Sequence, residues 1–74
     1  MDSGQYDKYK KLGLNIAYYR RDRGYTQEQL AEALGLDRTT ISKVESALSG
    51  VSLDVLFALS DLLDVPVKCF FDFR

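Results

Sequence analysis

Histidine and tryptophan are absent from the chain, and cysteine occurs once, as Cys69. Without histidine there is no cysteine–histidine zinc site, no Cys–His pair and no Ser–His–Asp triad. No apolar run approaches the ~20 residues of a membrane span, and residues 1–7 do not resemble a signal peptide. We therefore expect a protein that is not an enzyme, needs no metal or cofactor, has no membrane partner and stays in the cytoplasm.

Proline and glycine are scarce, with one and five residues among 74, and 46% of the residues are hydrophobic. This composition excludes collagen-like, low-complexity and disordered chains. The length fits one small domain, which we place at residues 8–74 behind a flexible N-terminal arm of residues 1–7. A core of this size supplies only ~3–5 kcal/mol of net stability, and dimerisation is one way to add more.

The charges are unevenly distributed, although the net charge is only -1. Residues 8–43 carry eight positive and four negative side chains, whereas residues 44–74 carry two positive and five negative ones. Such asymmetry indicates a basic functional end and an acidic end.

Apolar residues recur at helical spacing and no strand pattern is present, so we expect an all-α fold. The first helix runs from about Asp7 to Arg23 and stops at Gly24, which follows a cluster of cations. Gly13 lies inside this helix at a cost of ~1 kcal/mol relative to alanine. We therefore expect another backbone to pass close to Gly13.

Two short helices follow, joined by a three-residue turn. Thr26 opens the first of them with a capping-box pattern, and Gly35 ends it in a left-handed turn. Asp37 is expected to cap the next helix, which runs from Arg38 to about Ala47. A helix, a short turn that contains glycine and a second helix make up a helix-turn-helix unit.

A fourth helix begins after Ser52 as its cap and ends before Val65-Pro66, and residues 67–71 are expected to form a last helical turn. Leucines lie along one side of the fourth helix and are expected to face the core: Leu53, Leu56, Leu59, Leu62 and Leu63.

The third helix has two different faces on a helical wheel at ~100° per residue. Ile41, Val44 and Leu48 share one sector and are expected to face the core. The opposite side carries hydroxyls and cations without a carboxylate: Thr39, Ser42, Lys43 and Ser46, flanked by Arg38 and Thr40. These groups suit phosphates and base edges, whereas the alternative is an ordinary solvated helix face. The helix-turn-helix geometry before this face favours nucleic-acid recognition.

The stretch from Gln27 to Glu45, QEQLAEALGLDRTTISKVE, resembles the helix-turn-helix of the phage repressor/Cro family, also called the xenobiotic-response-element family. The resemblance covers about residues 10–71 without a gap. It implies a compact five-helix repressor-like DNA-binding domain with its helix-turn-helix unit at about residues 26–47.

The resemblance also implies roles for single residues. Side chains at four positions of the third helix read bases in the major groove: Arg38, Thr39, Ser42 and Lys43. Gln27 bonds a backbone phosphate at the positive start of the second helix, and Thr40 lies near the sugar-phosphate backbone. Arg20 and Glu45 form a partly buried structural ion pair between the first and third helices.

The loop after Glu45 departs from the family pattern. Many relatives carry a glycine and a basic residue there, whereas this loop reads SALSGV and has no cation. We expect Ser49 and the loop N–H groups to contact phosphate in place of that cation. With one electrostatic contact missing, we expect weak non-specific binding, because each lost phosphate contact reduces the salt slope by roughly 0.9.

The C-terminal end is unusually aromatic, with Phe70, Phe71 and Phe73 in succession. These side chains either fold back on the first and fourth helices or form part of a dimer interface. Tyrosines 18, 19 and 25 are expected at the edge of the core with their hydroxyls in water. Cys69 is most simply a small buried apolar side chain.

Two functions of different classes follow. The first is a sequence-specific regulator of transcription that binds double-stranded DNA as a homodimer on a near-palindromic operator. We expect this regulator to be a repressor. The second is a protein-interaction module of the same fold, such as an antitoxin whose acidic half neutralises a basic toxin.

Overall fold

A computed structural model describes residues 4–73 of the chain. Within this range the fold is all-α, and its helices in chain order are α1 (Tyr6–Asp22), α2 (Gln27–Leu34), α3 (Arg38–Glu45), α4 (Leu53–Leu63) and α5 (Val67–Phe70). The predicted all-α, five-helix architecture is confirmed. None of these helices combines the length and apolarity that are needed to cross a bilayer.

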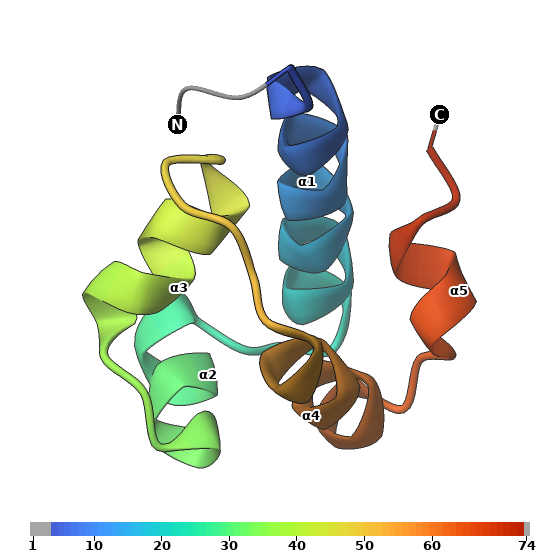
Figure 1. Cartoon of the computed structure of the whole chain (residues 1–74). Helices are drawn as coiled ribbons and strands as arrows, with labels where there is room; N and C mark the ends of the chain where they lie inside the picture. The colour runs from blue at the N-terminus through green and yellow to red at the C-terminus, as the bar shows by residue number, and fades with distance from the viewer. Residues whose placement is uncertain (1–3, 74) are drawn as a thin grey trace.

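Figure 1 shows the long helix α1 between two groups of elements. The pair α2 and α3, green to yellow, lies on one side of α1, and α5, red, lies on the other. α4 runs beneath them. Helix α1 begins at Tyr6, so the expected N-terminal arm of residues 1–7 is helical in its last two residues. Residues 1–3 of that arm lie outside the described residues.

Capping explains where several helices begin. The Thr26 hydroxyl accepts from the Gln29 N–H at 3.0 Å, while Gln29 Oε1 accepts from the Thr26 N–H at 2.9 Å. This reciprocal pair is the predicted capping box. The Ser52 hydroxyl accepts from the Val55 N–H and caps α4 as predicted. Asp37 occupies the cap position of α3, but its side chain makes no capping hydrogen bond, so that part of the prediction is wrong.

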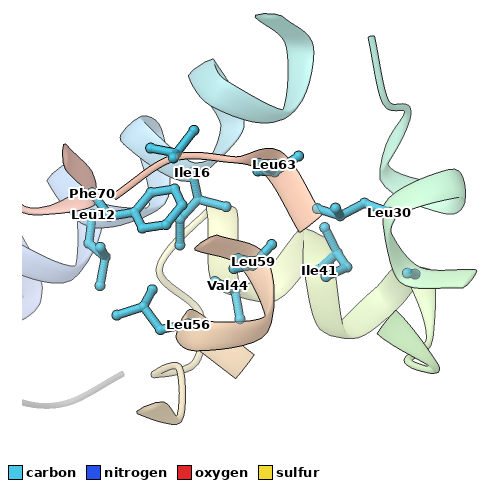
Figure 2. Packing of buried hydrophobic residues seen from close by; sticks show 11 residues of the cluster. Leu12, Ile16, Leu30, Ile41, Val44, Leu56, Leu59, Leu63 and Phe70 are labelled. Atoms are coloured by element: carbon cyan, nitrogen blue, oxygen red, sulfur yellow. The ribbon is translucent and has the colours of Figure 1, made fainter. Parts of the chain in front are cut away.

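One apolar cluster joins all five helices and fixes their arrangement (Figure 2). Its largest fully buried side chains are Phe70, Ile16, Leu30, Ile41, Leu56, Leu59 and Leu63. Burying a side chain of this size contributes ~1.5–3 kcal/mol, so the cluster is the main stabilising element of the fold. Through Leu30, Ile41 and Val44, the same cluster holds both helices of the predicted helix-turn-helix unit on α1 and α4.

Gly13 marks the close approach of α1 and α3. A Cβ atom built on Gly13 would lie 2.5 Å from the carbonyl oxygen of Glu45 and 2.7 Å from that of Val44. Real Cβ atoms do not approach backbone this closely, so only glycine fits here. The prediction of a passing backbone at Gly13 is confirmed.

The end of α3 differs from the prediction. The helix stops at Glu45, two residues before Ala47, and Ala47 takes a left-handed conformation with φ of 61°. This turn buries Ala47 completely and directs Leu48 outward, where 65% of it is exposed. The prediction that Leu48 faces the core is therefore wrong, because the helical wheel assumed a helix that continues past Ala47.

Leu53 is also exposed rather than buried. It is the first residue of α4, and the buried stripe of that helix consists of Leu56, Leu59 and Leu63. At ~100° per residue Leu53 lies nearly a quarter turn away from the centre of this stripe. The leucine spacing alone therefore overestimated the width of the core-facing side.

Candidate nucleic-acid interface

Helices α2 and α3 pack against each other at one side of the molecule and are joined by residues 35–37 (Figure 1). Gly35 ends α2 with φ of 70°, as predicted. Below this turn, the buried side chains of Leu30, Ala31 and Ile41 hold the two helices on the core. The outer side of α3 is thereby turned toward solvent while its inner side is fixed.

The exposed side of α3 carries the four predicted base-reading residues, although unequally. Arg38, Thr39 and Lys43 are exposed, whereas Ser42 is half-buried. Thr40, predicted to lie near the sugar-phosphate backbone, is also half-buried. The only carboxylate of α3 is Glu45, which points inward and is 9% exposed. The outer face of α3 therefore presents hydroxyl, guanidinium and ammonium groups to solvent.

The structure brings Arg20 and Glu45 together as a buried ion pair. Arg20 Nε donates to Glu45 Oε2 at 2.7 Å and the second guanidinium nitrogen donates to Oε1 at 3.1 Å. A further guanidinium nitrogen donates to the carbonyl of Tyr25 at 2.9 Å. The pair ties the last residue of α3 to α1, and it is bidentate, which is the strong geometry for arginine and carboxylate.

Gln27 also contacts this ion pair, a contact that the sequence did not reveal. Its Nε2 donates to Glu45 Oε1 at 3.0 Å across 18 residues of sequence. Because Gln27 is the first residue of α2, the N–H groups of Gln27 and Glu28 have no acceptor inside the helix. These donors and the positive end of the helix dipole suit an anion such as phosphate.

The loop after α3 contributes less than expected. Ser49 is half-buried, and the N–H groups of Leu48 and Ser49 both point back to the carbonyl of Lys43, at 2.8 and 3.4 Å. The expectation that these two N–H groups contact phosphate is therefore wrong, since they help to close the end of α3. The Ser49 hydroxyl and the N–H groups of Gly50 and Val51 stay candidate contacts.

Arg23 contacts both α4 and α1 from an exposed position. Its Nε donates to the carbonyl of Leu63 at the end of α4 at 2.9 Å, and its guanidinium lies 5.8 Å above the ring of Tyr19. A neighbouring ion pair with Asp22 completes the arrangement. Arg23 nevertheless remains exposed to solvent, as does Arg21.

The C-terminal aromatic residues divide between core and surface. Phe70 is fully buried, edge-on against Tyr19 of α1 at 5.8 Å between ring centroids, so of the two alternatives it folds back on the core and does not form a dimer interface. The side chain of Asn15 holds this segment against α1 by donating to the carbonyls of Phe70 and Asp72. Phe71 is 48% exposed and Phe73 is half-buried beside it.

A hollow of about 260 Å³ lies between this segment and the start of α1, lined by Gln5, Lys8, Tyr9, Leu12, Phe71 and Phe73. Cys69, expected to be a small buried apolar side chain, is a free thiol that packs half-buried against the core.

A bihelical unit with a three-residue turn, packed on a first helix through a buried arginine–glutamate pair, defines a helix-turn-helix protein. The helix-turn-helix family model matches residues 16–68, and the chain belongs to this Cro/C1-type family.

Particular relatives can be named. The chain is 41% identical over 56 residues to the control protein C.SmaI of Serratia marcescens, covering 76% of this chain and 67% of that protein. It is 34% identical over 62 residues to the transcriptional regulator SinR of Bacillus subtilis, covering 82% of this chain and 56% of SinR. The chain thus spans little more than half of SinR.

Solved structures agree with this family. The restriction-modification controller protein C.AhdI of Aeromonas hydrophila superposes with a TM-score of 0.86 and 32% identity, covering 93% of this chain and all of that chain. The biofilm regulator SinR, solved in complex with DNA, superposes with a TM-score of 0.76 and 34% identity, covering 82% of this chain and 98% of that chain.

Proposed function

We propose that this chain is a sequence-specific regulator of transcription that binds double-stranded DNA as a homodimer on a near-palindromic operator and acts as a repressor. The observation that carries this proposal is the outer face of α3, where exposed cations and hydroxyls stand on a helix whose only carboxylate is buried. The similarity to SinR, which has been solved in complex with DNA, supports DNA binding by this chain.

In this proposal, α3 enters the major groove, where Arg38, Thr39, Ser42 and Lys43 read base edges. Arginine can donate two hydrogen bonds to the O6 and N7 acceptors of guanine, and the threonine methyl can contact the methyl group of thymine. Phosphates are contacted by Gln27 at the start of α2, by Thr40 and by the Ser49 hydroxyl. The acidic side chains of residues 44–74 are not among these proposed contacts, but they keep the net charge of the chain low. Base contacts therefore carry more of the DNA affinity than in a strongly basic protein.

We expect a dimer because a single α3 helix contacts only a few base pairs. Two copies place their recognition helices about one DNA turn (~34 Å) apart and so read a two-fold symmetric site. Two apolar surfaces are candidates for the contact between copies: the exposed Phe71 with the half-buried Phe73, and the exposed Leu53 with Phe57 on α4. Sedimentation of Phe71→Glu and Phe57→Glu separates the two, because only the charge placed in the interface dissociates the dimer.

The experiment that tests this function is selection of bound fragments from a random duplex library at ~150 mM salt, because DNA affinity depends steeply on salt. We expect enrichment of a two-fold symmetric motif. If a well-folded protein enriched no motif, the proposal would be wrong. Co-purification with a basic protein partner would then support the antitoxin-like alternative, in which the acidic half of the chain binds that partner.

Substitutions separate base contacts from phosphate contacts. We expect Lys43→Ala to cost ~1–3 kcal/mol of binding and to relax preference at particular base pairs. Gln27→Ala should weaken binding to all duplexes alike. Lys68→Ala, which removes an exposed cation from α5, is the matched control and should leave both affinity and preference unchanged. Equal losses for Lys43→Ala across all base pairs would contradict the base-reading role.

A further inference from the structure

A polar network connects the recognition helix to the first residue of α2. The carboxylate of Glu45 accepts three hydrogen bonds, two from Arg20 and one from Gln27 Nε2, at distances of 2.7, 3.1 and 3.0 Å. Each of the three residues comes from a different helix, α1, α2 or α3. Arg20 and Glu45 are buried, whereas Gln27 is half-buried and reaches solvent.

The chemistry of the two groups fixes how the Gln27 carboxamide is turned. A carboxylate that is paired with a guanidinium carries no proton, so it can only accept hydrogen bonds. A carboxamide has a donor side and an acceptor side, and only the donor side, Nε2, can face Glu45. One of the two Nε2 hydrogens is thereby used. The second Nε2 hydrogen is left for another acceptor, and the hydrogen bond to Glu45 already fixes the position of its nitrogen.

We propose that Glu45 is a positioning residue for DNA binding: it holds the Gln27 carboxamide in one orientation, so that the second Nε2 hydrogen is preorganised for a phosphate oxygen. The inference rests on the proposed function, in which Gln27 contacts phosphate. Holding the side chain in place before binding removes part of the entropy that ordering it would cost. Since Glu45 belongs to α3, the network also fixes the phosphate contact relative to the base-reading helix.

The unmodified protein provides the first test. In nuclear magnetic resonance spectra, the two Nε2 hydrogens of Gln27 should have well-separated shifts, with one of them slow to exchange with solvent. Addition of the selected duplex should shift the other hydrogen. Two Nε2 hydrogens that exchange equally fast in the free protein would show a freely rotating carboxamide and overturn the proposal.

Variants provide the second test, with affinity measured at low temperature, where circular dichroism shows each protein folded. Gln27→Met keeps the length of the side chain and removes its donor, and it should weaken binding to every duplex about fivefold. Glu45→Gln allows the carboxamide both orientations and should weaken binding about threefold. In the double variant the losses should not multiply, because both changes remove the same contact.

Arg20→Lys is the matched control. It weakens the same ion pair from the other side, lowers the melting temperature, and leaves the carboxylate of Glu45 facing Gln27. We expect its DNA affinity to stay within about twofold of the unmodified protein, since the Gln27–Glu45 hydrogen bond remains. If Arg20→Lys and Glu45→Gln lost equal affinity, Glu45 would be a structural residue only.

The outcomes separate this inference from the function on which it rests. If Gln27→Met bound all duplexes normally, the phosphate contact of Gln27 in the proposed function would be wrong. If Gln27→Met lost affinity but the losses multiplied in the double variant, the phosphate contact would stand and the positioning role of Glu45 would fall.

Discussion

The proposed recognition helix α3 lies between two turns of the same kind that are built from different residues. In each, one residue takes a left-handed conformation, Gly35 before α3 with φ of 70° and Ala47 after it with φ of 61°. The next residue then donates its N–H to the carbonyl five residues earlier, at 2.8 Å in both turns. Both are Schellman endings, one with the expected glycine and one without.

The surroundings of the two turns differ, and this difference explains why one of them can contain alanine. Gly35 is exposed, and a Cβ atom there would meet nothing within 4 Å, so its turn depends on the residue itself. Ala47 is fully buried and lies two residues after Glu45, whose side chain pairs with Arg20 of α1 and whose carbonyl lies close to Gly13 of α1. Left-handed alanine costs ~1–2 kcal/mol. The first turn is set locally, whereas tertiary contacts impose the second.

The largest expected effect comes from removing the anchor of the second turn. Glu45→Ala leaves the buried guanidinium of Arg20 without its partner, which costs ~3–5 kcal/mol when a buried pair is broken. We expect the melting temperature to fall by more than ~10 °C, measured by circular dichroism. Lys11→Ala breaks the exposed ion pair with Asp7 at 3.4 Å and serves as the control, with an expected change below ~1 kcal/mol.

The next effect comes from the contact beneath the same turn. Gly13→Ala places a methyl 2.5 Å from the carbonyl oxygen of Glu45, and backbone at that distance must move. We expect a loss of ~1–3 kcal/mol in urea unfolding, from overpacking. Gly50→Ala is the matched control, because its nearest neighbour is the side chain of Tyr9 at 3.6 Å, an ordinary contact. Equal stabilities for the two variants would show that α1 and α3 can separate without cost.

Most of the elements that sequence predicted correctly have local signals. The capping box at Thr26, the cap at Ser52 and the left-handed Gly35 each depend on residues within four positions of one another. Helical spacing identified Ile16, Leu59 and their neighbours as core for the same reason. The pairing of Arg20 with Glu45 was predicted from the family resemblance, because residue spacing within one helix cannot predict a contact between two helices.

Three interactions that sequence did not predict join distant segments. Gln27 meets Glu45 across 18 residues, Arg23 meets the carbonyl of Leu63 across 40, and Asn15 meets the carbonyl of Phe70 across 55. A side chain's distant partner depends on how helices pack, and periodicity contains no such information. For the candidate site, sequence supplied the exposed residues of α3 but not the network that holds Gln27.

The turn before α3 offers the third prediction. Gly35→Ala forces a side chain into a left-handed conformation that no buried contact supports, so we expect a loss of ~1–2 kcal/mol. Urea unfolding measures this loss. Gly4→Ala is a suitable control, since Gly4 also has open space around it but no positive φ. A Gly35→Ala variant as stable as the control would mean that the turn before α3 is also imposed by tertiary contacts.

The smallest effect is expected for the reverse substitution in the turn after α3. Ala47→Gly removes the left-handed strain, a gain of ~1–2 kcal/mol. It also removes a fully buried methyl, worth ~0.8 kcal/mol, and gives the unfolded chain more freedom, worth ~0.4–1 kcal/mol. These opposed terms nearly cancel, so we expect urea unfolding to change by less than ~1 kcal/mol. A stabilisation well above that value would show that burial of the Ala47 methyl contributes nothing to stability. The left-handed conformation of Ala47 would then be a net cost to the folded protein.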